Sequence, residues 1–86
     1  PLFILEKIMN FVVYTRTGCP YCTKIKQVLE GKRYAYTEKQ LNRDFTREGF
    51  YAQFGPGTTF PQVVKDTVNL GGCTETVRYL RENNLI

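Results

Sequence analysis

The stretch TRTGCPYC, Thr15–Cys22, lies between an apolar run, Phe11–Tyr14, and a segment with helical periodicity, Thr23–Leu29. This order predicts a strand, a turn and a helix, with Cys19 and Cys22 at the turn. Backbone N–H groups in the first turn of a helix lack intrahelical partners, and the macrodipole places partial positive charge there. Both effects favour a thiolate, which is the nucleophilic form of cysteine. The stretch therefore predicts a redox-active dithiol whose nucleophile is Cys19.

The composition is that of an ordinary soluble globular domain. The 86 residues allow one hydrophobic core, and 42% of them are hydrophobic and 23% charged. The longest apolar runs, Leu2–Leu5 and Phe11–Tyr14, are far shorter than the roughly 20 residues of a membrane-spanning helix. The formal charge of +4 comes from scattered lysines and arginines, which favours an anionic small substrate over nucleic acid. We expect a soluble monomer with no membrane and no nucleic-acid partner.

The cysteine count indicates a reducing compartment. Three cysteines cannot all pair within the chain, and the close spacing of Cys19 and Cys22 is a poor staple for a secreted domain. We therefore expect a cytoplasmic protein. The chain has no histidine, and only Cys73 could join the pair, so a structural zinc site with four ligands is disfavoured and no metal is expected. An inert buried cysteine pair is the other alternative.

Strand and helix patterns alternate along the chain. Strands are predicted at residues 10–14, 33–38, 60–65 and 67–70, and helices at about residues 20–29, at about residues 42–53 and after Gly71-Gly72. Lys65-Asp66 is predicted to form the turn of the last hairpin, and Phe3, Phe11, Phe45 and Phe54 to lie in the core. The order β-α-β-α-β-β-α predicts an α/β fold, a four-stranded mixed sheet with three helices.

The first residues are expected to lie outside this domain. The chain starts at Pro1, and Met9 is a candidate for the native initiator. Residues 1–8 show no basic segment followed by a small-residue cleavage site, so a signal peptide is not expected. We assign residues 1–8 to an N-terminal extension or cloning remnant and residues 9–86 to one domain.

Three segments resemble the glutaredoxin family. Tyr14–Cys22 matches the family's active-site segment almost letter for letter, Thr59–Val63 resembles its Thr-Val-Pro segment, and Gly71–Glu75 resembles its Gly-Gly-Cys-Ser/Asp-Asp segment. The three occur in the family's order and at its spacing. The resemblance covers the chain from about Met9 to the end and implies a thioredoxin-like fold.

The resemblance also implies an activity. The chain would be a glutathione-disulfide oxidoreductase that reduces protein disulfides and glutathione mixed disulfides. Glutathione would be the electron donor and co-substrate, and no tightly bound cofactor is expected. Cys19 would form the mixed disulfide, and Cys22 would resolve protein disulfides. The implied partners are disulfide-containing or glutathionylated proteins, ribonucleotide reductase among them.

The glutathione-binding residues implied by the resemblance are Arg16, Tyr21, Thr59, Phe60, Pro61, Cys73 and Thr74. Pro61 would follow a cis bond and expose the backbone of Phe60 to the cysteine residue of glutathione. The helix start at Cys73 and Thr74 would hold a carboxylate, with Thr74 also capping the helix. Arg16 would meet a carboxylate and favour the thiolate. Each of four residues also has a purely structural interpretation. Arg16 would be a solvated charge, Tyr21 would pack on the turn, Thr74 would only cap the helix, and Cys73 would be a small apolar filler.

The chain departs from the family pattern at three places. Phe60 stands where valine is usual, Gly57-Thr58 where many members carry a basic residue, and Thr76 where leucine is usual. Glutathione affinity is therefore less firmly implied than the chemistry at Cys19. Two other functions stay open: a redoxin fed by thioredoxin reductase, and a dimer holding a [2Fe-2S] cluster through Cys19 of each chain and two glutathiones.

Overall fold

The structure, a computed structural model, describes residues 10–86, so the predictions for Phe3 and for residues 1–8 lie outside the described part of the chain. The elements are β1 (Phe11–Thr15), α2 (Pro20–Gly31), β2 (Tyr36–Gln40), α3 (Arg47–Phe54), β3 (Gln62–Lys65), β4 (Val68–Gly71) and α4 (Cys73–Glu82). The predicted order of strands and helices is confirmed. No helix within residues 10–86 has the length and apolar character needed to cross a membrane.

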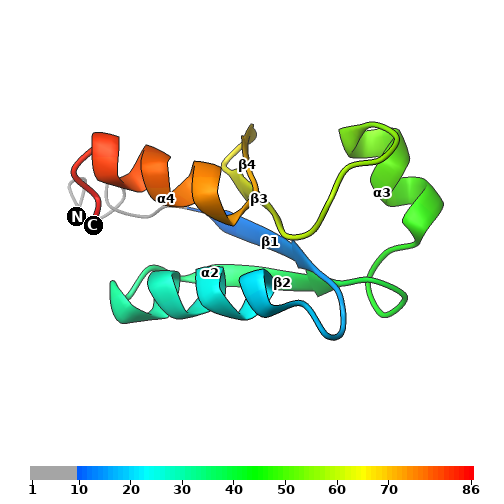
Figure 1. Cartoon of the computed structure of the whole chain (residues 1–86), viewed down its shortest axis with the longest axis horizontal. Helices are drawn as coiled ribbons and strands as arrows, with labels where there is room; N and C mark the ends of the chain where they lie inside the picture. The colour runs from blue at the N-terminus through cyan, green and yellow to red at the C-terminus, as the bar shows by residue number, and fades with distance from the viewer. Residues whose placement is uncertain (1–9) are drawn as a thin grey trace.

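The four strands form one mixed sheet in the order β2-β1-β3-β4 (Figure 1). β1 pairs in parallel with β2, because the crossover helix α2 returns the chain to the same end of the sheet. β1 pairs antiparallel with β3, and β3 pairs antiparallel with β4. β1 is therefore a central strand, and it carries the chain directly into the cysteine turn.

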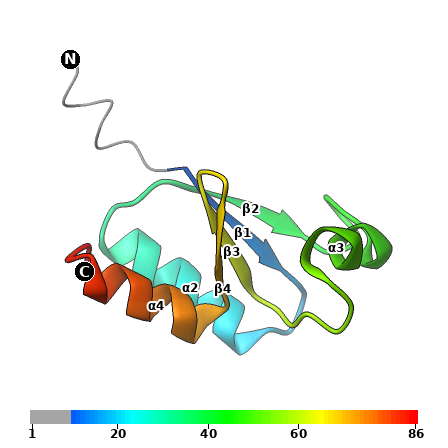
Figure 2. The same ribbon diagram turned by 90° about the horizontal axis from the view of Figure 1, so that it is seen from above.

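Helices α2 and α4 lie side by side against one face of the sheet (Figures 1 and 2). Successive side chains of a strand point to opposite faces, so every second residue of β1 faces these helices. Phe11 and Val13 are buried there against residues of both helices and of β3. The fully buried members of this core are Phe11, Val13, Ile25, Leu29, Val63 and Leu80.

A second group of apolar side chains, the aromatic cluster, packs α3 near the end of β1. Tyr14 of β1 meets Phe45 and Phe54 edge-on, with ring centroids 5.3 and 5.0 Å apart. Phe50 of α3 stacks on Phe60 with centroids 4.3 Å apart. The aromatic cluster therefore joins α3 to β1 and to the segment before Pro61. Phe11 lies in the core as predicted, whereas Phe45 and Phe54 are half-buried in the aromatic cluster.

The boundaries of β2 and α3 differ from those predicted. β2 begins at Tyr36 and not at residue 33, because Arg33 adopts a positive φ of 61° in the turn after α2. α3 begins at Arg47 and not at residue 42, because Asn42 has a φ of 69° and Thr46 caps the helix, its hydroxyl accepting from the N–H of Gly49 at 3.1 Å. Left-handed backbone cannot continue a helix or a strand.

The hairpin turn between β3 and β4 also lies one residue later than predicted. Lys65 is the last residue of β3, and the turn is formed by Asp66 and Thr67. Asp66 has a φ of 58°, a conformation that aspartate tolerates better than most residues. The hairpin itself, and its antiparallel pairing, are as predicted.

Candidate active site

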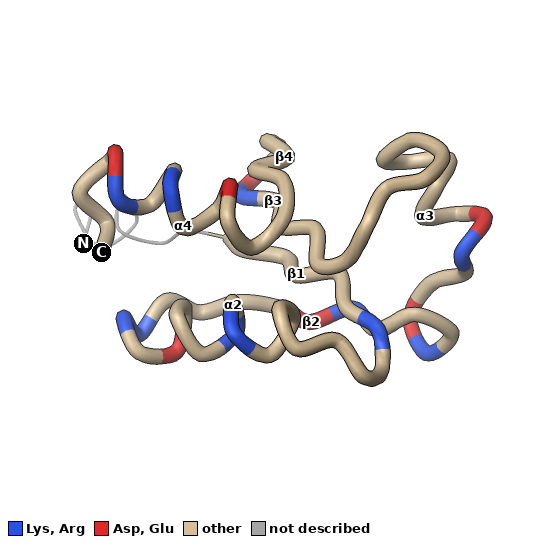
Figure 3. The backbone as a smooth tube through the Cα atoms, in the orientation of Figure 1, with Lys and Arg blue, Asp and Glu red and all other residues tan. Residues whose placement is uncertain are grey.

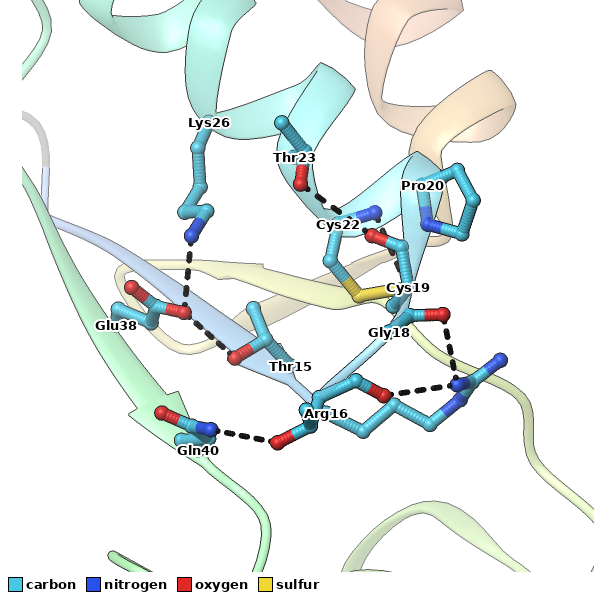
Figure 4. A pocket seen from close by; sticks show the side chains of 11 residues that line it. Thr15, Arg16, Gly18, Cys19, Pro20, Cys22, Thr23, Lys26, Glu38 and Gln40 are labelled. Atoms are coloured by element: carbon cyan, nitrogen blue, oxygen red, sulfur yellow. Dashed lines mark hydrogen bonds and ion pairs between the residues drawn. A yellow bond between two sulfur atoms is a disulfide. The ribbon is translucent and has the colours of Figure 1, made fainter.

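Cys19 and Cys22 lie at the start of α2 and form a disulfide (Figure 4). Cys19 is the N-cap residue of α2, and its Sγ accepts a hydrogen bond from the backbone N–H of Cys22 at 3.1 Å. The same N–H is placed to stabilise a Cys19 thiolate after reduction, together with the helix dipole. Both residues are buried, and Cys19, at 7% exposed against 2% for Cys22, is the more exposed residue of the pair.

A groove beside the cysteines, the Pro61 groove, gathers most of the predicted glutathione-binding residues. It has a volume of about 150 Å³ and is lined by Tyr21, Thr59, Phe60, Pro61, Gly72, Cys73, Thr74 and Glu75. The Phe60–Pro61 peptide bond is cis, as predicted. Tyr21 is 60% exposed, so it does not pack into the turn. The structure thus brings six of the seven predicted residues to one place.

The start of α4 forms one wall of the Pro61 groove. Gly72 is the N-cap residue, and its N–H donates to Glu75 Oε1 at 3.0 Å. The prediction that Thr74 caps the helix is wrong, because α4 begins at Cys73 and Thr74 already lies in its first turn. The N–H groups of Cys73 and Thr74 have no intrahelical partners there and are available to an anion.

The two glycines of this wall, Gly71 and Gly72, differ in what they permit. Gly71 has a φ of 100°, which other residues rarely adopt. A Cβ on Gly72 would lie 3.1 Å from Glu75 Oε1 and 3.5 Å from the carbonyl oxygen of Pro61. The backbone of Gly72 therefore closely approaches both the cap and the cis-proline segment.

Arg16 is the predicted residue that the structure places elsewhere. It lines a recess on the other side of the disulfide, the β2 recess, which has a volume of about 560 Å³ (Figure 4). Its Nη1 donates to the carbonyl oxygens of Thr17 and Gly18, at 3.1 and 3.2 Å. Arg16 thus braces the turn that leads into Cys19.

The β2 recess contains a polar network that the sequence analysis missed. Glu38 Oε2 accepts from Thr15 Oγ1 at 2.7 Å and from Lys26 Nζ at 3.1 Å (Figure 4). Partial burial pulls the pKa of the Glu38 carboxyl upward, but these two hydrogen bonds and the charges of Lys26 and Arg43 outweigh it and lower the pKa. The alternation of Tyr36, Glu38 and Gln40 along β2 was the available signal, since it places Glu38 on the face that α2 covers.

Cys73 is a buried free thiol, 7% exposed. Burial raises its pKa, which disfavours the reactive thiolate. Its environment therefore supports the interpretation of a small apolar filler at the edge of the groove. Within residues 10–86 there is no group of three or more His, Cys, Asp or Glu side chains placed to hold a metal ion.

Comparison with known proteins agrees with this geometry. The glutaredoxin family model matches residues 11–68, which is more than half of the chain and includes both cysteines. The chain belongs to the glutaredoxin family. Glutaredoxins are thiol-disulfide oxidoreductases, and the Cys19–Cys22 pair is the Cys-x-x-Cys motif on which a thiol-disulfide redox function rests.

Individual glutaredoxins are similar over most of their length. Glutaredoxin 1 of Rickettsia conorii is 36% identical over 79 residues, which cover 88% of this chain and 76% of that protein. The crystal structure of glutaredoxin 1 from Francisella tularensis, 32% identical, superimposes with a TM-score of 0.75 over 90% of this chain and 96% of that one. The architecture is thus the thioredoxin-like fold of glutaredoxins.

A more distant structure shows the same fold. The buckwheat glutaredoxin–glutathione complex superimposes with a TM-score of 0.70 over 98% of this chain and 82% of that chain. It is 23% identical in sequence, so this likeness concerns the fold.

Proposed function

We propose that this glutaredoxin uses glutathione to reduce protein disulfides and glutathione mixed disulfides. The observation that carries the proposal is the Pro61 groove, which joins the cis-proline segment to the start of α4 beside the cysteine pair. Thr59–Pro61 offers backbone to a short extended peptide, and the first turn of α4 offers N–H donors to a carboxylate. A tripeptide thiol with two carboxylates has both features.

Reduction of a protein disulfide would proceed by two exchanges on the protein. The Cys19 thiolate attacks one substrate sulfur, so that a Cys19–substrate bond forms while the substrate S–S bond breaks and releases a thiolate. The Cys22 thiolate then attacks Cys19 Sγ, releases the second substrate sulfur and leaves the Cys19–Cys22 disulfide. Two glutathione molecules restore the dithiol in two further exchanges and leave as glutathione disulfide.

Reduction of a glutathione mixed disulfide needs fewer groups. Cys19 takes over the glutathionyl group and releases the substrate thiol, and a second glutathione then attacks that mixed disulfide. Cys22 takes no part in this route. The start of α2 supports both routes, because the N–H of Cys22 and the helix dipole stabilise Cys19 each time it leaves as a thiolate.

The test is glutathione-coupled turnover of a small glutathione mixed disulfide by the wild type and two single variants. We expect Cys19→Ser to abolish activity, because it removes the nucleophile. We expect Cys22→Ser to keep a good part of it, because glutathione itself resolves the intermediate. Equal loss in both variants would count against this route.

Two further measurements on the purified wild-type protein test the two other functions that the sequence left open. Turnover supported by thioredoxin reductase, and not by glutathione, would replace the proposal with a reductase-fed redoxin. A brown protein with an iron–sulfur absorption spectrum after anaerobic purification would support the hypothesis of a dimer that holds a cluster. That dimer needs Cys19 as a free thiolate, so the purification must first reduce the Cys19–Cys22 disulfide.

A further inference from the structure

A second groove opens between α2 and α4, next to the Pro61 groove. This groove, the α2–α4 groove, has a volume of about 440 Å³, roughly three times that of the Pro61 groove at about 150 Å³. Half-buried Val28 and Val77 form its apolar part. The basic side chains of Lys24, Arg78 and Arg81 surround this apolar part.

The charge of the α2–α4 groove is positive and uncompensated. Lys24, Arg78 and Arg81 are exposed, and none of their side chains takes part in the ion pairs or side-chain hydrogen bonds found within residues 10–86. No carboxylate side chain of the described residues lines the groove. Figure 3 shows basic segments on both α2 and α4. A site with three cations and no anion attracts negative charge.

The acidic side chains of α2 and α4 are Glu30, Glu75 and Glu82, and none of them lines the α2–α4 groove. Glu75, about one turn before Arg78, accepts a hydrogen bond from the Gly72 N–H and so places its charge at the helix cap. Glu30, near the end of α2, accepts a hydrogen bond from the hydroxyl of Tyr36. Glu82 is exposed and makes no ion pair within residues 10–86. Because it does not line the groove, the groove itself presents three cations and no carboxylate to a ligand.

The α2–α4 groove is continuous with the place where chemistry occurs. Tyr21, Cys73 and Thr74 line both it and the Pro61 groove. From Thr74 to Arg81 the helix rises by about 10 Å at about 1.5 Å per residue. An extended peptide covers that distance with about three residues. A polypeptide whose cysteine reacts at Cys19 can thus reach the basic side chains with residues only a few positions away.

We propose that the α2–α4 groove binds an acidic segment that flanks the reactive cysteine of a protein substrate. The proposal rests on the proposed function, and it names the class of protein that this glutaredoxin reduces best. An extended acidic segment places carboxylates on Lys24, Arg78 and Arg81 and apolar side chains on Val28 and Val77. Glutathione itself, held in the Pro61 groove, does not need these three cations.

The experiment compares two disulfide-bonded peptides that differ only in the flank of the cysteine. One carries Asp and Glu within about six residues of it, and the other carries Asn and Gln. Glutathione-coupled kcat/KM is measured for both peptides and for a small glutathione mixed disulfide. The groove variant is Arg78→Gln with Arg81→Gln, and the charge-matched control is Lys39→Gln with Arg47→Gln, both exposed and outside both grooves.

We expect the wild type to prefer the acidic peptide by about tenfold at low salt, because charge complementarity raises association rates and specificity. The groove variant should lose about three- to tenfold on the acidic peptide and little on the other two substrates. Equal kcat/KM for the two peptides, or an equal loss in the control variant, would overturn the proposal while turnover of the small mixed disulfide upholds the proposed function. Absence of turnover with all three substrates would overturn both.

Discussion

Thr76 carries a buried polar atom that the surrounding structure does not satisfy. It is 0% exposed on α4, and its Oγ1 has no hydrogen-bond partner within residues 10–86. An unsatisfied buried hydroxyl costs about 1–3 kcal/mol. We therefore expect Thr76→Val, which keeps the shape and removes the hydroxyl, to raise the free energy of unfolding by about 1 kcal/mol.

Urea unfolding of the wild type and two variants checks this expectation. Thr76→Ser is the matched control, because it keeps the hydroxyl and removes the methyl group. It should lower the free energy of unfolding by about 1 kcal/mol. A destabilised Thr76→Val variant would mean that the hydroxyl has a partner after all.

Glu38 makes stability depend on pH. Its pKa is lowered in the folded protein, so the carboxylate contributes stability above its unfolded pKa of about 4.3 and loses that contribution as pH falls through the folded value. Glu38→Gln should cost about 1 kcal/mol at neutral pH, since the Lys26–Glu38 pair is partly exposed. The destabilisation caused by Glu38→Gln should become smaller toward about pH 3, because the wild-type carboxylate is then increasingly protonated.

Unfolding by urea at several pH values measures this difference. Glu82→Gln serves as the control, because Glu82 is exposed and takes part in none of the ion pairs within residues 10–86. Its effect should stay within about 0.5 kcal/mol throughout. A cost of Glu38→Gln that grows in acid would contradict the assigned direction.

At the scale of elements, the helices and strands that depend on residues close in sequence were predicted correctly. β1 and α2 follow from an apolar run, a glycine turn and a proline at the helix start, all within one short stretch. The start of α3 depends on a left-handed Asn42 and on a hydrogen bond from the Gln40 N–H to Asp44 Oδ2 at 2.8 Å. The helical spacing of apolar residues before Arg47 does not reveal either feature.

The residues of the candidate site fall into two groups. Some could be placed from the sequence, and others depend on side-chain direction or on strand register. Residues inside the three motifs reach the Pro61 groove, because the order of strands and helices alone brings those motifs together. Arg16 lies within the cysteine motif, but the direction of an exposed side chain is not set by its position in the sequence. The pairing of Lys26 with Glu38 requires the register in which Val13 lies opposite Glu38, and that register emerges only from the folded sheet.

Helix α3 depends on the aromatic cluster. Phe50 is 1% exposed, and it contacts Phe60 and Phe54 with ring centroids 4.3 and 4.9 Å apart. Replacing a buried phenylalanine by alanine costs about 3–5 kcal/mol, so Phe50→Ala should remove a large part of the stability of this small domain. Because Phe60 directly precedes Pro61, we also expect a higher KM for glutathione mixed disulfides.

Denaturant unfolding and steady-state kinetics test both expectations. Val68→Ala is the control, since Val68 is 59% exposed and its loss should cost less than about 1 kcal/mol. If Phe50→Ala were no more destabilising than Val68→Ala, the aromatic cluster would not be what holds α3. Phe50 does not line the Pro61 groove, so an unchanged KM would show that the cis-proline segment keeps its place without support from α3.

At the scale of the whole molecule, two helices direct their positive ends toward the site. α2 and α4 run side by side in the same direction, so both begin at the same end of the sheet (Figure 1). Cys19 caps α2, and Gly72 caps α4 at the edge of the Pro61 groove. The formal charge of the chain, +4, has the same sign. Anionic substrates are therefore attracted by the fold as well as by single side chains.

This attraction predicts a dependence on ionic strength. Raising the salt from about 0.01 M to about 1 M shortens the Debye length from about 30 Å to about 3 Å. kcat/KM for a small glutathione mixed disulfide should then fall severalfold, because long-range steering of the anion is lost. A neutral small disulfide, reduced by the same dithiol and measured by loss of the disulfide in single turnover, should change little. An equal fall for both substrates would show that salt acts on the thiol chemistry at Cys19 and not on the approach of the anion.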